Sequence, residues 1–339
     1  MRRHNANPAI ALVFGFACLL ALTVGVSRAQ DQPQRQFFQI ATGSTAGSYF
    51  PIGELIAGIV SHPPGVARCD TPGVCGPPGL IVSARTSEGA VANVLAVNAG
   101  ETDSGLAQSN VVADAVTGRG EFRSRQKHIR VIASLFPEPV QLVVAANSWI
   151  ENVRDLRGKR VSIGTEGSGV GVVAHAILAA YGLSQRSLKA SREPYDVSAE
   201  LLKQRRLDAF FFLGTAPAPL IEDLFAHGAA RLVAIDGNAR RRLLRRVSSL
   251  TADTIPQGAY PGTGTVETVS SRTLWVVKDS ASPDVVYGLL RALFDPANRG
   301  LLDAGGARHI RLDEATSGLT APLHDGAERF YRQMGKLRL

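Results

Sequence analysis

Short β-branched runs alternate with helix-like segments along most of this chain, which is typical of an α/β protein with a largely parallel sheet. The predicted strands, each bounded by turn residues, are residues 37–42, 80–83, 103–107, 129–135, 140–145, 160–163, 208–213, 231–235 and 274–277. The predicted helices are residues 52–60, 89–99, 170–181, 218–226 and 240–246. We therefore expect an α/β fold in which helices flank mainly parallel sheets.

The order of these elements predicts two similar lobes. Both series open with a strand, a Gly-rich turn and a helix, and the run at 274–277 resembles a strand of the first series. The chain is therefore expected to return to the first lobe near Ser270. We predict lobe 1 from residues 30–145 plus 271–339 and lobe 2 from residues 146–270. Two crossings between lobes would form a hinge, and a hinge implies a cleft.

The two Gly-rich turns are the first candidates for a binding site. The first runs from Thr42 to Tyr49 (TGSTAGSY) and the second from Gly164 to Gly171 (GTEGSGVG). Glycine permits a tight backbone, Ser and Thr offer hydroxyl groups, and the N-terminus of the following helix favours an anion. Either turn alone could simply connect a strand to a helix. Their matching positions favour two opposed turns that hold one small anionic or zwitterionic ligand.

The N-terminus has the pattern of a signal peptide, predicted at residues 1–29. Arg2 and Arg3 precede an apolar run at 9–26, and small residues flank Arg28 at the −3 and −1 positions of a cleavage site. A membrane anchor is the alternative, because the run approaches the about 18 residues needed to span a bilayer. The polar residues at 31–36 favour cleavage. Removing the three arginines of this segment from the formal charge of +8 leaves +5.

Export would place Cys69 and Cys75 in an oxidising compartment, where a disulfide between them is expected. A metal site is the alternative, but no His or further Cys lies near them in the sequence. We expect neither a metal nor a cofactor. The glycines of the second turn do not fit the dinucleotide fingerprint, and no phosphate-loop lysine follows them.

Catalytic and nucleic-acid motifs are weak, which favours binding without turnover. The chain has no His-Glu-x-x-His spacing, and Gly43-Ser-Thr-Ala-Gly47 carries Thr where a nucleophile elbow needs Ser. The basic run at 240–246 contains no aromatic residue for base stacking, so no nucleic-acid partner is expected. We interpret this run as a solvated helix face, or otherwise as a docking surface for an acidic partner.

Several segments resemble the TAXI-family solute receptors of tripartite ATP-independent periplasmic (TRAP) transporters. They are Thr42–Gly53, Gly105–Asn110, Ala133–Val140, Asp155–Gly164, Gly214–Pro219, Ile255–Gly262 and Pro322–Tyr331. The resemblance covers about residues 37–331. It implies a two-lobed periplasmic-binding-protein clamshell, monomeric and located in the periplasm, that closes on a small organic solute. The implied solute is a glutamate-like amino acid or a dicarboxylate, delivered to an ion-gradient-driven TRAP permease.

The resemblance also implies which residues bind the ligand. They are Thr42, Gly43, Ser44, Thr45, Ser48, Tyr49, Gln108, Ser109, Asn110, Glu166, Gly167, Ser168, Gly169, Thr215, Ala216 and Pro217. Glu166 could meet an ammonium group or could be an exposed first-turn acid. The sequence departs from the family at Ser44 and Ala46, where further glycines are usual. It also departs at residues 69–79, an apparent insertion whose distance from the cleft would decide whether it alters specificity.

Two other functions compete with a transport receptor. A soluble sensor that presents its ligand to a membrane kinase would need the same clamshell and would differ only in its partner. An exported enzyme would need a catalytic constellation, which the motifs above do not supply.

Overall fold

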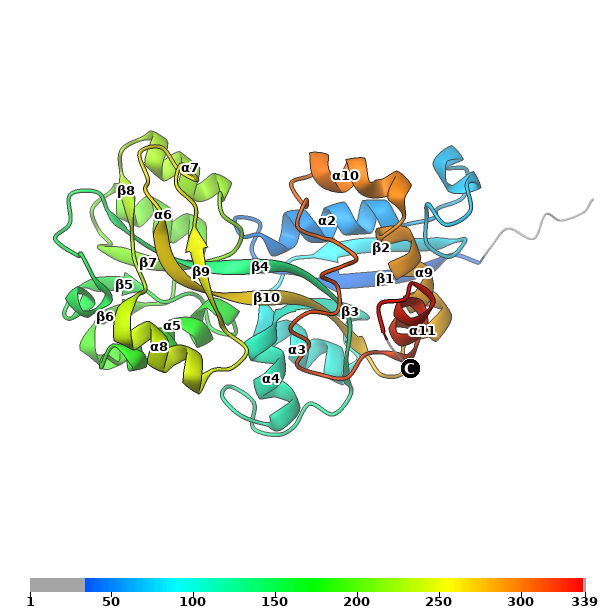
Figure 1. The fold of residues 1–339 in the computed structure, drawn as a ribbon, viewed down its shortest axis with the longest axis horizontal. Helices are drawn as coiled ribbons and strands as arrows, with labels where there is room; N and C mark the ends of the chain where they lie inside the picture. Colours follow the sequence, from blue (N-terminus) through cyan, green and yellow to red (C-terminus); the bar gives the residue numbers. More distant parts are fainter. Residues whose placement is uncertain (1–33, 338–339) are drawn as a thin grey trace, which may run out of the picture. The chain divides into compact units, whose positions relative to one another are not determined.

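The computed structural model describes residues 34–337, so the predicted signal peptide lies outside the described residues. One ten-stranded sheet has the order β2-β1-β3-β10-β4-β7-β5-β6, with β8 beside β4 and β9 beside β10. The strands are β1 (Gln36–Ala41), β2 (Leu80–Arg85), β3 (Ser104–Gln108), β4 (Ile129–Ala145), β5 (Arg160–Ser162), β6 (Lys189–Ser191), β7 (Ala209–Leu213), β8 (Ala230–Val233), β9 (Thr251–Ile255) and β10 (Val266–Lys278). Figure 1 shows how helices flank this sheet.

Ten α-helices pack around the sheet in the described residues, and several of them have caps that the sequence explains. They are α2 (Tyr49–Val60), α3 (Ala90–Ala99), α4 (Ser109–Thr117), α5 (Gly169–Ala180), α6 (Tyr195–Lys203), α7 (Pro219–Ala226), α8 (Gly237–Arg246), α9 (Pro283–Leu293), α10 (Arg299–Ala304) and α11 (Asp325–Gln333). Gly100 and Gly118 end α3 and α4 in the left-handed conformation that glycine adopts without strain. Ser282 caps α9, whose first residue is Pro283. None of the described helices has the length and apolar character needed to cross a membrane.

The sheet is mixed, whereas the sequence suggested mainly parallel sheets. Strand β1 is parallel to β2 and β3, and β5 is parallel to β6 and β7. The pairs formed by β4 with β7, β8 and β10 are antiparallel, as are those of β10 with β3 and β9. The two-lobed α/β architecture is as expected. The difference arises because the same two strands, β4 and β10, enter both halves of the sheet.

Strand β4 is a single strand of 17 residues, although two strands at 129–135 and 140–145 were predicted. The prediction was wrong because Pro137 and Pro139 resemble a break. Strand β7 pairs with β4 only from Val140 onward, so the segment with the two prolines has β10 as its one paired strand. Proline is tolerated where a strand has a free side. Figure 1 shows that β4 and β10 run continuously through both halves of the fold.

Two sets of buried apolar side chains form the cores. One contains residues between Phe38 and Phe136 together with residues between Leu274 and Tyr331. The other, in two adjoining clusters, is drawn from residues between Val140 and Val269. We refer to the parts built around these cores as lobe 1 and lobe 2. The boundaries predicted at 145/146 and 270/271 remain a prediction, and the second falls within β10.

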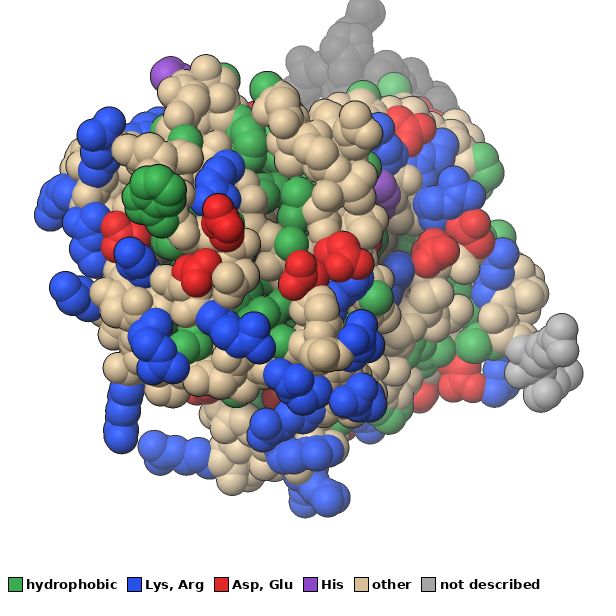
Figure 2. Space-filling view, turned by 60° about the vertical axis from the view of Figure 1, so that its left-hand side comes forward, with side chains coloured by type: hydrophobic (Ala, Val, Ile, Leu, Met, Phe, Trp, Pro, Cys, Tyr) green, Lys and Arg blue, Asp and Glu red, His purple; other side chains and the backbone are tan. Residues whose placement is uncertain are grey.

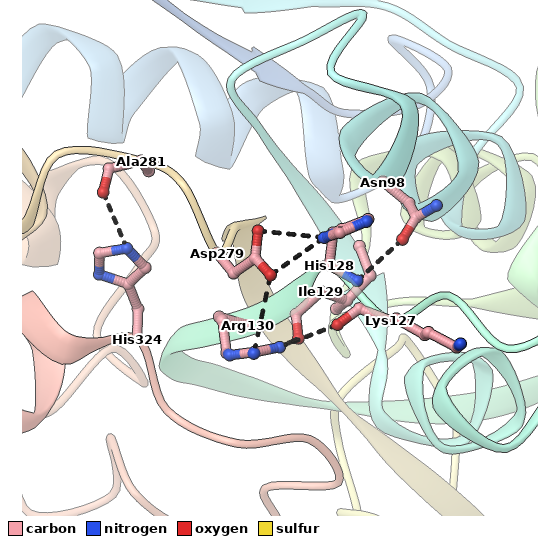
Figure 3. A network of polar contacts seen from close by, with 8 residues as sticks. All are labelled: Asn98, Lys127, His128, Ile129, Arg130, Asp279, Ala281 and His324. Atoms are coloured by element: carbon pink, nitrogen blue, oxygen red, sulfur yellow. Dashed lines mark hydrogen bonds and ion pairs between the residues drawn. The ribbon is translucent and has the colours of Figure 1, made fainter.

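Polar contacts hold the lobe 1 ends of β4 and β10 together (Figure 3). The backbone N–H of Asp279 donates to the carbonyl of His128 at 2.8 Å. The Asp279 carboxylate lies 3.0 Å from His128 Nδ1 and 3.7 Å from a guanidinium nitrogen of Arg130. The backbone N–H of His128 donates to Asn98 in α3 at 3.1 Å. The two long strands are therefore fixed to each other and to a helix at this end.

The structure contains the expected disulfide between Cys69 and Cys75, with 5.2 Å between the two Cα atoms. The loop that it closes packs against lobe 1, where Asn298 Nδ2 donates to the carbonyl of Val74 at 2.7 Å. This contact joins the loop to the segment between α9 and α10. The apparent insertion at residues 69–79 is thus part of the outer surface of lobe 1.

Candidate functional site

A cavity of about 370 Å³ lies between the two lobes. This volume is within the range of small-molecule sites. Residues from both lobes line it: Gly43–Thr45, Gly47–Tyr49, Thr86–Ala90, Gln108 and Glu138, and on the other side Gly164, Thr165, Ser168–Val170, Glu193–Asp196 and Leu213. No residue of the 69–79 loop lines the cavity.

The cavity brings the two Gly-rich turns together, one on each side. The predicted site residues that line it are Gly43, Ser44, Thr45, Ser48, Tyr49, Gln108, Ser168 and Gly169. The other eight predicted residues do not line it. Their roles in binding remain predictions.

Three of these eight are buried in contacts within the fold. Thr42 donates its hydroxyl to the carbonyl of Arg85 at 2.6 Å. Ser109 and Asn110 begin α4 and contact Ser271 of β10, whose hydroxyl donates to the Asn110 side chain at 2.8 Å. These side chains connect elements around the cavity rather than facing it.

The other five lie on lobe 2. Glu166 has a side chain that is 91% exposed and pairs with Arg192 at 3.5 Å. The carbonyl of Gly167 accepts the backbone N–H groups of Val91 and Ala92 in the first turn of α3. The N–H of Thr215 donates to the Ser48 hydroxyl at 3.0 Å. Ala216 and Pro217 are joined by a cis peptide bond ahead of α7. Gly167 and Thr215 therefore connect the lobes on two sides of the cavity.

Glycines also allow the lobes to approach each other closely. A Cβ atom at Gly169 would overlap Oε1 of Gln108, and one at Gly214 would overlap the Ser48 hydroxyl. Neither glycine has a positive φ, so the missing side chain matters for space and not for backbone conformation. Tighter than usual contacts would also arise between Gly89 and Ser168 and between Gly47 and Tyr195. In each pair the two residues belong to different lobes, so the two lobes touch each other in this structure.

Glu138 is the most deeply buried acid among the lining residues that sequence reasoning missed. It lies in β4 between two prolines and is fully buried. Its carboxylate accepts hydrogen bonds from the Tyr49 hydroxyl (2.9 Å), from Gln108 Nε2 (2.8 Å) and from the Thr273 hydroxyl. Burial raises the pKa of Glu138 to about 7, although the three donors act to lower it. The available signal was an acid within an otherwise apolar strand, which is rarely buried without a reason.

Every charged side chain that lines the cavity is acidic. Glu88, Glu193 and Asp196 accompany Glu138, and within the described part of the chain no Lys, Arg or His lines the cavity. Glu88 and Asp196 are exposed and Glu193 is half-buried, so these three lie nearer to solvent than Glu138 does. Among residues 34–337, no three His, Cys, Asp or Glu side chains are grouped so that they could hold a metal ion.

Four helices begin at the cavity, each with its first residue in the lining. They are α2 at Tyr49, α3 at Ala90, α5 at Gly169 and α6 at Tyr195. The first turn of a helix leaves backbone N–H groups without helical partners and carries a partial positive charge. The cavity thus combines acidic side chains with several backbone donors.

Solved structures share this fold at low sequence identity. The structure of a periplasmic transporter aligns over 90% of this chain and 94% of its own length, with 13% identity and a TM-score of 0.53. A protein from Bordetella bronchiseptica RB50 aligns over 88% and 98%, with 13% identity and a TM-score of 0.52. The alkanesulfonate-binding protein SsuA from Xanthomonas axonopodis pv. citri, bound to MOPS, aligns over 88% and 84%, with 17% identity and a TM-score of 0.47. The NMT1-like family profile matches residues 40–335, so this chain belongs to the NMT1-like family.

Proposed function

We propose that this protein is an exported receptor that captures a small organic solute between its lobes and delivers it to a membrane permease. The observation that carries this proposal is the cavity lined by both Gly-rich turns, at a place where the lobes touch through glycines. A solute that contacts both lobes favours the closed arrangement over the open one. The permease would then recognise the closed, solute-bound form of the receptor.

The chemistry of the lining supports binding without turnover. The hydroxyl groups of Ser44, Thr45 and Ser168 donate to none of the lining carboxyl groups, and no His or Lys lies among the lining residues to act as a general base. The hydroxyl groups of Ser44 and Thr45 and the helix N-termini would supply hydrogen bonds to a polar solute, whereas the Ser168 hydroxyl already donates to the carbonyl of Thr165. The resemblance to TAXI receptors supports a TRAP permease as the partner and the periplasm as the location.

The proposal is tested by thermal shift with a panel of amino acids, dicarboxylates and sugars. A solute at 100 times its Kd should stabilise the protein by about 2.7 kcal/mol. Gly169→Ala should weaken binding of that solute by roughly tenfold, because the new methyl group displaces Gln108 and hinders closure.

Gly171→Ala is the matched control. It lies two residues further along α5, and a Cβ there would meet its neighbours at ordinary distances of 3.5 Å or more. Equal affinity of both variants for the solute would argue against binding in this cavity. Uptake of the solute into vesicles that carry a TRAP permease, dependent on this protein, would test the partner. Activation of a membrane kinase instead would favour a sensor.

A further inference from the structure

We propose that the solute carries a protonated amine and has a net charge of zero or above, as in a neutral amino acid or an amine. This inference rests on the proposed function and narrows its ligand class, because a dicarboxylate or a sulfonate is then disfavoured. It follows from the charges of the lining, from one unpartnered acceptor and from the positions of the nearest arginines.

The acidic lining is the first observation. Glu138 lies buried at the cavity, while Glu88, Glu193 and Asp196 stand closer to solvent. A cleft whose walls carry charge of one sign concentrates the opposite charge, here a cationic group. An anion without an amine would meet four carboxyl groups and no cationic side chain.

The arginines that are nearest to the lining segments in the sequence contact residues outside the cavity lining. Arg85 precedes the lining segment 86–90 but donates to the Gln39 side chain at 3.0 Å. Arg192 precedes Glu193 but pairs with Glu166, outside the lining. Figure 2 shows many Lys and Arg side chains over one face of the molecule. The formal charge of the whole chain is +8, so the acidic cavity is a local departure from a basic protein.

Gln108 supplies the second, independent observation. Its side-chain nitrogen donates to Glu138, which fixes the amide so that Oε1 faces away from that carboxyl group. Among the described residues this buried oxygen has no hydrogen-bond partner, and it lies against Gly169, where a Cβ atom would overlap it. A buried acceptor without a partner costs about 1–3 kcal/mol. Since Gln108 and Gly169 both line the cavity, an N–H donor of the solute that enters between them, such as an ammonium group, would satisfy this oxygen.

The helix N-termini explain why one carboxylate is still acceptable. Backbone N–H groups at the starts of α2, α3, α5 and α6 favour an anionic group. A neutral amino acid can place its carboxylate there and its ammonium group toward the acids. A second carboxylate would have no cationic partner in the lining.

The test compares matched probes by isothermal titration calorimetry at pH 8. The first set contains neutral amino acids, with glutamine among them, and the diamine putrescine. The second contains glutamate, 2-oxoglutarate, succinate and ethanesulfonate. We expect the best probe of the first set to bind at least roughly tenfold more tightly than every member of the second. Tighter binding by any member of the second set overturns this inference and leaves the receptor function standing. Binding by neither set also overturns this inference, and the receptor function is overturned only if the wider thermal-shift panel gives no ligand either.

Variants test whether the acids select the amine. Glu193→Gln and Asp196→Asn should each weaken the best probe by roughly three- to fivefold, the effect of losing one partly exposed charge pair. Added salt should reduce this difference. Glu200→Gln is the control, because Glu200 lies exposed on α6, the helix that carries Asp196, and does not line the cavity. Affinity that is unchanged in both lining variants, or equally weakened in the control, would overturn the inference.

Discussion

Two carboxyl groups attached to the long strands behave in opposite ways. Glu138 lies within β4, is fully buried and accepts hydrogen bonds only from neutral donors, and burial raises its pKa to about 7. Asp279 follows β10 at the other end of the strand pair and contacts His128 and Arg130. The hydrogen bond from His128 is the main cause that lowers the pKa of Asp279. Burial therefore decides the direction of the pKa shift for Glu138, whereas the hydrogen bond from His128 decides it for Asp279, which is partly exposed.

The opposite pKa shifts distinguish the two roles: Asp279 joins the strand ends, whereas Glu138 lies at the cavity. The hydrogen bond from His128 and the charge of Arg130 stabilise the ionised form of Asp279, and these contacts fix the strand ends. Neutral partners leave Glu138 close to its titration point near neutral pH. Groups with strongly perturbed pKa values cluster at functional sites, which agrees with the position of Glu138 in the cavity lining.

The largest expected effect is on the pH dependence of stability in Glu138→Gln. The raised pKa means that the folded state binds the proton more tightly than the unfolded state, whose pKa is near 4.5. The stabilisation is complete below pH 4.5 and is lost as the pH rises through about 7. Between pH 4.5 and pH 8, Glu138 should lower the unfolding free energy by about 3 kcal/mol. Urea unfolding of both proteins across this range should show a difference of this size, and parallel pH profiles would contradict it.

Tyr49→Phe should have a smaller effect that also depends on pH. Its hydroxyl donates to Glu138, and a hydrogen bond to a charged group contributes about 1.5–3 kcal/mol against about 1 kcal/mol for a neutral pair. The variant should therefore lose more stability at pH 8 than at pH 5. Tyr287→Phe is the control, because the Tyr287 hydroxyl donates to Gln333 at an exposed position. A loss that is the same at both pH values would indicate that Glu138 does not ionise in this range.

Asp279→Asn should have the smallest effect, at most about 1 kcal/mol, because the pair is partly exposed. The sign is opposite to that of Glu138. A lowered pKa gives stability that is present above the unfolded pKa of 3.8 and is lost as the pH falls through the folded value. Urea unfolding in low and high salt should show a difference between variant and wild type that salt reduces. A pH-dependent change as large as that expected for Glu138→Gln would mean that burial is not what separates the two groups.

Local patterns predicted the regular elements better than they predicted the site. Apolar runs gave the buried strands and helices α2, α3, α5, α7 and α8, but helices α4, α6, α9, α10 and α11 and strands β6 and β9 were missed. Strand β6 has only three residues, and β9 is largely exposed beside β10, so neither carries a buried apolar pattern. The mixed sheet was missed because pairing direction depends on where β10 inserts, far along the chain.

The Gly-rich turns supplied much of the cavity lining because each combines a turn with a helix start. The acids were missed for a different reason. Glu138 was part of a segment quoted for its resemblance, and its burial depends on β10 and α2 closing around it. Glu193 and Asp196 follow the short β6, and they line a cavity only because the two lobes meet at this place. Such residues gain their neighbours from tertiary structure, which no local spacing encodes.

The insertion of β10 between β3 and β4 also has a consequence for folding kinetics. Until residues 266–278 are in place, β3 has β1 as its only strand neighbour, and the sheet of lobe 1 has an open edge. Pairing Val276 with Gly105 closes a very long loop, and such non-local contacts form slowly. Lobe 2 draws its core from one continuous stretch and can form it without waiting for the C-terminal residues. We therefore expect lobe 2 to refold first, with the exposed edge of β3 as the place where refolding chains associate.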